Sequence, residues 1–72
     1  MRYREVNDIT RDGFTVKVND VVMLHGHGKA LVKKIQLGWL HYRVGVILIN
    51  NPDAFKGMTG GVGYFHMNEI VK

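Results

Sequence analysis

The sequence predicts an all-β protein: a small, strongly bent barrel of five to six short antiparallel strands, preceded by an N-terminal β-hairpin. Three observations support this fold class. Apolar and polar residues alternate along several short runs, as in half-buried strands. Turns that contain glycine separate these runs at short intervals. The 72 residues, of which 46% are apolar, can form one compact core, so we expect a single domain over residues 1–72.

The hairpin is predicted around Asp12 and Gly13. An Asp-Gly pair between β-favouring residues is the strongest short-range hairpin signal, because both positions tolerate a positive φ. Residues 14–18 then alternate between apolar and polar types, which predicts a half-buried strand. A further turn is expected at residues 19–20.

The next predicted strand covers residues 21–25, with Val22 and Leu24 facing the core because they alternate with Val21 and Met23. It ends in a tight turn of sequence His-Gly-His-Gly. Glycine allows such a turn because its backbone adopts a positive φ without steric cost.

Residues 29–37 are ambiguous, because a helix would also put Leu31 and Ile35 on one side at a spacing of four. We favour a strand, since valine and isoleucine prefer strands and glycine turns flank the segment. Two lysines interrupt the alternation, so a β-bulge is predicted near Lys33 and Lys34. Gly38 and Trp39 should end the strand.

Residues 41–50 give the clearest strand pattern. One face carries Tyr42, Val44, Val46 and Leu48. The other face starts with His41 and Arg43 but ends with Ile47 and Ile49. A strand that is apolar on both faces is usually covered twice. We therefore expect the N-terminal hairpin or another subunit to pack over Ile47 and Ile49.

The rest of the chain predicts a long loop and two short strands. Pro52 suits the first position of a single helical turn capped by Asn51. Residues 62–67 predict a strand, and the following Asn-Glu-Ile a 3₁₀ turn before a last short strand at Val71. Four glycines lie among residues 57–63, and loops this long are commonly functional or mobile.

Part of this pattern resembles the KOW-type SH3-like barrels. The residues that carry the resemblance are an acidic residue and an apolar strand at 20–24, the glycine turn with Lys29, and the strand through Ile35. The terminal Met-Asn-Glu-Ile-Val-Lys is similar to the 3₁₀ turn and final strand that close such barrels. The resemblance spans about residues 19–72 and implies an SH3-like barrel that binds RNA or the ribosome. The Asp-Gly hairpin would be an addition to it.

The composition excludes several activities. There is no serine and no cysteine, so serine and cysteine nucleophiles and disulfides are impossible. Lys29 follows a glycine but precedes alanine, so no GxxxxGK[ST] phosphate-binding loop is present. The longest apolar run, residues 44–49, is far shorter than a membrane span, and the N-terminus lacks an apolar signal core. We expect a soluble cytoplasmic protein that is not a membrane partner.

The charge pattern predicts an anionic ligand. Ten Lys and Arg against six Asp and Glu give a net charge of +4, which favours nucleic acid or another phosphate-bearing partner. Glycine N–H groups beside lysines can approach a phosphate closely, and aromatic residues among basic ones can stack on bases. The predicted anion-binding residues are Gly26, Gly28, Lys29, Lys33, Lys34, Trp39, Arg43 and Lys56. Tyr42 falls on the apolar face and is more readily a core residue.

Two other functions stay open. Ile47, Ile49 and Met58 could form an apolar interface with a host protein or a second copy, as in small accessory proteins of bacteriophages, which this chain resembles only in style. Histidine accepts and donates protons near neutral pH, so His25 and His66, with Lys29 holding charge, could instead serve a ribonuclease. We expect a non-catalytic protein without a cofactor.

The histidine spacing also raises the question of a metal. His25 and His27 are two residues apart and could share a strand face, a spacing at which imidazoles can bind zinc. A site would need His41 or His66 to converge on them, with Glu69 or water completing it. Histidines in a turn are more simply solvated, so we expect no metal.

Overall fold

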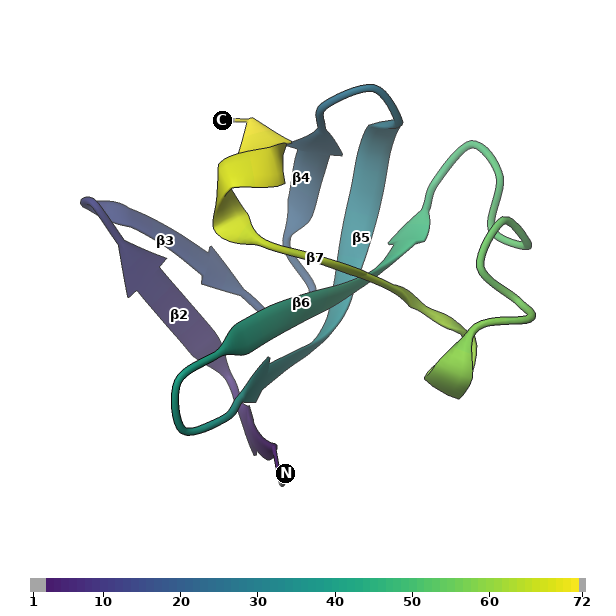
Figure 1. Cartoon of the computed structure of the whole chain (residues 1–72). Coiled ribbons are helices and arrows are strands. Elements are labelled where there is room, and N and C mark those ends of the chain that lie inside the picture. Colours follow the sequence, from purple (N-terminus) through teal and green to yellow (C-terminus); the bar gives the residue numbers. More distant parts are fainter. Residues whose placement is uncertain (1–2, 72) are drawn as a thin grey trace.

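Residues 3–71 are described by a computed structural model, and their fold is all-β, as predicted. A six-stranded antiparallel sheet curls into a half-barrel, and a separate two-stranded hairpin stands beside it (Figure 1). The main sheet has the strand order β7-β6-β5-β4-β8, and β1 pairs with β5 off this path. The two ends of the path are not paired with each other, so the expected barrel is open rather than closed.

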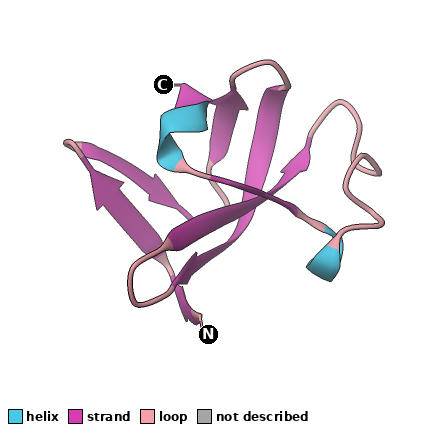
Figure 2. Ribbon diagram, in the orientation of Figure 1, coloured by secondary structure: helices cyan, strands magenta, loops and turns pink. Residues whose placement is uncertain are grey.

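The elements are short and are joined by turns, with two 3₁₀ turns as the helical segments of the described chain (Figure 2). The strands are β1 (Arg4–Val6), β2 (Asp8–Arg11), β3 (Phe14–Lys17), β4 (Val21–Leu24), β5 (Gly28–Leu37), β6 (Tyr42–Leu48), β7 (Gly63–Phe65) and β8 (Ile70–Val71). The 3₁₀ turns are η1 (Thr59–Gly61) and η2 (Met67–Glu69). The 3₁₀ turn and final strand at the C-terminal end match the prediction.

The hairpin of β2 and β3 forms as its turn residues predict. Asp12 has a φ of 53° and Gly13 a φ of 78°, the positive pair that a type I′ turn requires. The hydroxyl groups of Thr10 and Thr15, which face each other across the two strands, lie 2.7 Å apart. The turn residues Asp12 and Gly13 thus set the register of the whole hairpin.

A β-bulge in β5 is also confirmed. Val32 pairs with Val46 and Lys34 with Gly45, so Lys33 is the extra residue. Val32 and Ile35 are both fully buried, although three positions separate them. The bulge therefore keeps the apolar residues on the inner side of the sheet and sends two consecutive lysines to the outer side.

The core lies on the inner side of the curled sheet. Its buried members are Val16, Leu24, Ala30, Val32, Ile35, Val44, Val46, Met67 and Ile70. The hairpin contributes Val16 and packs Ile9 and Phe14 against this cluster. The hairpin therefore covers the inner side of the sheet. The expectation that it packs over Ile47 and Ile49 is wrong. The reason is that Asn19 N–H donates to Val32 O, which ties the end of the hairpin to the edge of β5.

The loop between β6 and β7 has no helical turn at Pro52. Three successive turns form instead, in which the N–H groups of Ala54, Lys56 and Met58 donate to the carbonyl groups three residues before them. The single 3₁₀ turn comes later, at η1, where Gly60 has a φ of 75°. Phe55 is half-buried against the core and anchors this loop.

Replacing Gly63 with alanine is expected to lower the free energy of unfolding by about 1–3 kcal/mol, the range for overpacking. A Cβ on Gly63 would lie 2.7–2.8 Å from three ring carbons of Phe55, so the ring would have to leave its place. Urea unfolding followed by far-UV circular dichroism measures the change. Gly57→Ala is the control, because no atom lies within 4 Å of its added Cβ. Equal losses in both variants would show that the Phe55 contact is not responsible.

Candidate nucleic-acid interface

The outer face of the sheet is where the cations of β5 and β6 meet aromatic residues, because the core occupies the inner face. Strand register places the side chains in rows across this face. One row joins Glu5, Gln36 and Arg43, and the next joins Lys34, Gly45 and Tyr64. Residues far apart in the sequence therefore become neighbours.

Arg43 lies between two tyrosine rings. Its Cζ is 4.0 Å from the ring centroid of Tyr64 and 4.3 Å from that of Tyr3. Its Nε donates to Oε1 of Gln36 at 2.7 Å. Cation–π contacts of this kind orient a guanidinium group as well as stabilise it. The two terminal amino groups of Arg43 have no acceptor within residues 3–71, so they stay available to a ligand.

Lys34 crosses the sheet over Gly45. A Cβ on Gly45 would lie 2.8 Å from Cγ of Lys34, so the missing side chain is what lets the lysine stem pass. The stem ends at η1: Lys34 Nζ lies 3.2 Å, and the Tyr64 hydroxyl 3.4 Å, from where a Cβ on Gly60 would stand. An ammonium group and a phenol group thus converge at the glycine loop.

Trp39 extends this arrangement at the opposite end of the face. It lies in the turn between β5 and β6, where Gly38 N–H donates to His41 O at 2.6 Å, and it is 90% exposed. Trp39 and Tyr3 line the same shallow pocket, together with Arg4. We call the five residues Trp39, Tyr3, Arg43, Tyr64 and Lys34 the aromatic–basic row.

The charges of the row are not neutralised by the protein. Neither Lys34 nor Arg43 forms an ion pair within the described part of the chain. Glu5 faces the same side through its register with Gln36, and Lys33 is exposed beside Lys34. Two lysines and an arginine on one face against one carboxylate leave that face electropositive.

Several predicted anion-binding residues lie elsewhere. Gly26 and Gly28 have φ values of 82° and 89° and form the turn at the start of β5, with Lys29 next to them. Trp39 follows the other end of β5, so the length of this strand separates it from the glycine turn. Lys56 is exposed in the loop after β6. The structure thus brings together Lys33, Lys34, Arg43 and Trp39 but separates them from the glycine turn.

Sequence reasoning missed Tyr3 and Gln36 and left the orientation of Tyr64 open. Alternation along residues 62–67 could have identified Tyr64, because Phe65 is apolar and packs on the core. No local signal marks Tyr3, which meets Arg43 only because β1 pairs with β5. Tyr42 is on the inner side, where its hydroxyl accepts a hydrogen bond from Met67 N–H at 2.9 Å.

The histidines do not form a metal site in the part of the chain that the structure describes, where no group of three or more potential ligands is positioned for one. His25 and His27 lie in the turn after β4, and the ring of His27 is 5.5 Å from that of Phe65. His66 packs edge-on against Tyr42 at 5.3 Å, and His41 lies in the turn before β6.

The predicted apolar interface is partly accessible. Ile49 and Met58 are 42% and 53% exposed, and Ile47 is half-buried. A protein partner on these residues stays a prediction.

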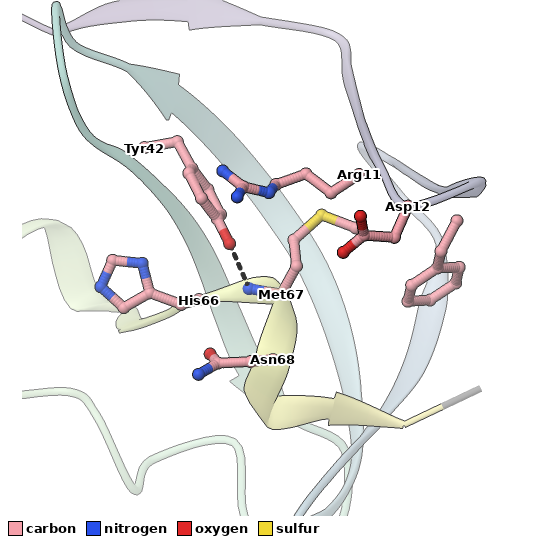
Figure 3. Close-up of a pocket in the computed structure, with 7 residues that line it drawn as sticks. Arg11, Asp12, Tyr42, His66, Met67 and Asn68 are labelled. Carbon is pink, nitrogen blue, oxygen red and sulfur yellow. Dashed lines mark hydrogen bonds between the residues drawn. The ribbon is translucent and has the colours of Figure 1, made fainter.

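A pocket of about 420 Å³ lies on the other side of β6, between the hairpin tip and η2 (Figure 3). Arg11 and Asp12 line it from the hairpin, Tyr42 from β6, and Met67 and Asn68 from η2. The Arg11 guanidinium lies over the Tyr42 ring, with Cζ 5.1 Å from its centroid. The sequence did not indicate this pocket, because its two walls are separated by more than half of the chain.

Comparisons with protein-family models, curated proteins and solved structures gave no match to this chain. The resemblance to KOW-type barrels therefore stays a prediction. Within residues 3–71 there is no helix with the length and apolar character needed to cross a membrane.

Proposed function

We propose that this protein is a non-catalytic binding module for single-stranded nucleic acid and that the aromatic–basic row is its contact surface. The single observation that carries the proposal is the alternation of aromatic and cationic side chains along one sheet face, from Trp39 through Arg43 to Lys34, with no carboxylate paired to either cation in residues 3–71. This is the arrangement that binds a single strand with little sequence preference.

The two kinds of side chain would contribute differently. Stacking of a base on an aromatic ring is worth about 1–3 kcal/mol and tolerates any base, and Trp39 is the most exposed ring of the row. Each cation that neutralises a phosphate releases counterions, which supplies a salt-dependent attraction. Tyr3 and Tyr64 already hold Arg43 in place, so less side-chain entropy is lost when it meets a phosphate.

Lys34→Ala is the first test, with a fluorescein-labelled single-stranded dodecamer titrated by anisotropy at several salt concentrations. The wild-type protein should show a linear fall of log K with log salt, and Lys34→Ala should reduce the magnitude of this slope by about 0.7, the value for one lost phosphate contact. Lys17→Ala is the matched control: it removes the same charge from β3, on the separate hairpin, and should leave the slope unchanged.

Two further readings complete this experiment. Trp39 is the single tryptophan, so its emission should be quenched as the dodecamer binds. A denaturing gel of the same samples should show intact strands; cleavage would favour the ribonuclease alternative. Wild-type binding that is absent, or that does not change between low and high salt, contradicts the proposal.

A further inference from the structure

We propose that the pocket between the hairpin and η2 receives one guanine base of the bound strand, an inference that rests on the proposed function. The pocket of about 420 Å³ is within the size range of small-molecule sites and is large enough for a nucleobase. Tyr42, Met67 and Phe14 contribute aromatic and apolar surface to its lining. This surface can contact the face of a flat ring beside the Arg11 guanidinium, which already lies over the Tyr42 ring.

The polar groups around the pocket suit the edge of guanine. The Arg11 side chain has no hydrogen-bond acceptor within residues 3–71, so its N–H groups are free to donate. The carboxylate of Asp12 has no donor there either. Guanine combines the acceptors O6 and N7, which arginine binds as a fork, with N–H donors that a carboxylate accepts. Uracil and thymine lack this combination of a purine acceptor pair and an amino donor.

Two hydrogen bonds position η2 beside the pocket. The Tyr42 hydroxyl accepts from Met67 N–H, and the Glu69 carboxylate accepts from His66 N–H at 3.0 Å. The first bond holds η2 against β6, and the second caps η2 itself, so both help to fix the shape of the pocket. The free groups Arg11 and Asp12 stand next to each other at the tip of the hairpin, whose type I′ turn fixes their backbone.

The pocket and the aromatic–basic row lie on opposite sides of one strand end. Tyr42 and Arg43 are consecutive in β6 and point to opposite faces of the sheet. β7 is the terminal strand of the sheet order beside β6. Its other edge is therefore unpaired within the described residues. His66, exposed directly after β7, contacts the Tyr42 ring at this edge. A strand lying along the row can therefore turn around the edge and place one base in the pocket.

The test compares a thymidine dodecamer with the same dodecamer carrying one central guanine, both titrated by anisotropy at one salt concentration. The wild-type protein should bind the guanine strand roughly 5- to 100-fold more tightly, the range for one bidentate arginine contact. Arg11→Ala should abolish this preference, and Arg11→Lys should weaken it, since lysine keeps the charge but lacks the planar fork. Lys17→Ala should retain it.

The outcomes separate the two proposals. Equal wild-type affinity for both strands, or a preference that survives in Arg11→Ala, overturns the guanine pocket and leaves the proposed function standing. If the wild-type protein shows no salt-dependent binding to either strand, the proposed function is overturned. Arg11 is exposed, so both variants should keep the wild-type far-UV spectrum.

Discussion

Replacing Arg43 with alanine is expected to weaken single-strand binding by about 10- to 100-fold, a larger loss than any other single change in the aromatic–basic row. The substitution would remove the phosphate contact proposed for Arg43. It also removes the group that packs between Tyr3 and Tyr64, whose ring centroids lie 4.3 and 4.0 Å from its Cζ. Losses of about 1–3 kcal/mol are typical when one stacking or charged contact is removed.

The measurement is anisotropy with the thymidine dodecamer at low salt, so that weak binding remains detectable. Arg43→Lys serves as the conservative variant. Lysine keeps the charge but cannot fit flat between two rings or donate as a fork, so its affinity should fall between those of the wild type and Arg43→Ala. If Arg43→Ala bound like the wild type, the row would not be the contact surface.

Replacing Ile35 with alanine is expected to lower the free energy of unfolding by about 2–5 kcal/mol, the range for deleting a large buried aliphatic side chain. Ile35 is fully buried and is paired directly with both Val6 of β1 and Val44 of β6. The cavity would therefore open where three strands meet. A domain of this size has on the order of 4–11 kcal/mol of stability, so the loss is a large fraction of it.

Urea unfolding followed by far-UV circular dichroism measures this effect, because Trp39 is already 90% exposed and its emission reports poorly on unfolding. Ile49→Ala is the matched control: it removes the same atoms from a side chain that is 42% exposed. Its loss should be well below that of Ile35→Ala. Similar losses at both positions would mean that Ile35 does not occupy the core.

The local elements of the fold were predictable because each depends on neighbouring residues. Asp12 and Gly13 specify their turn through the φ values they tolerate. The two lysines that break the apolar alternation of β5 mark the bulge at Lys33. Pro52 misled, because a proline suited to a first helical position also fits a turn, and nothing local distinguishes the two.

The candidate site was predictable only in part. Lys33, Lys34, Arg43 and Trp39 were identified from residue type, but the glycine turn that seemed to belong with them lies at the far end of β5. Tyr3 joins Arg43 through the pairing of β1 with β5, and Arg11 reaches Tyr42 through the packing of the hairpin on the core. The two residues in each of these contacts are more than 30 positions apart in the sequence.

The residue pattern alone was enough to identify an all-β chain, the positions of its hairpin turn and bulge, and the core-facing side chains of β6. It did not identify those of β5, because the bulge moves Ala30 and Val32 to the inner side in place of Leu31. The sharing of one face by cations and aromatic rings, and the pocket beside Tyr42, became visible only in the folded chain. Turn geometry and alternation depend on adjacent residues, whereas the curl of the sheet and the docking of the hairpin depend on apolar contacts between distant segments.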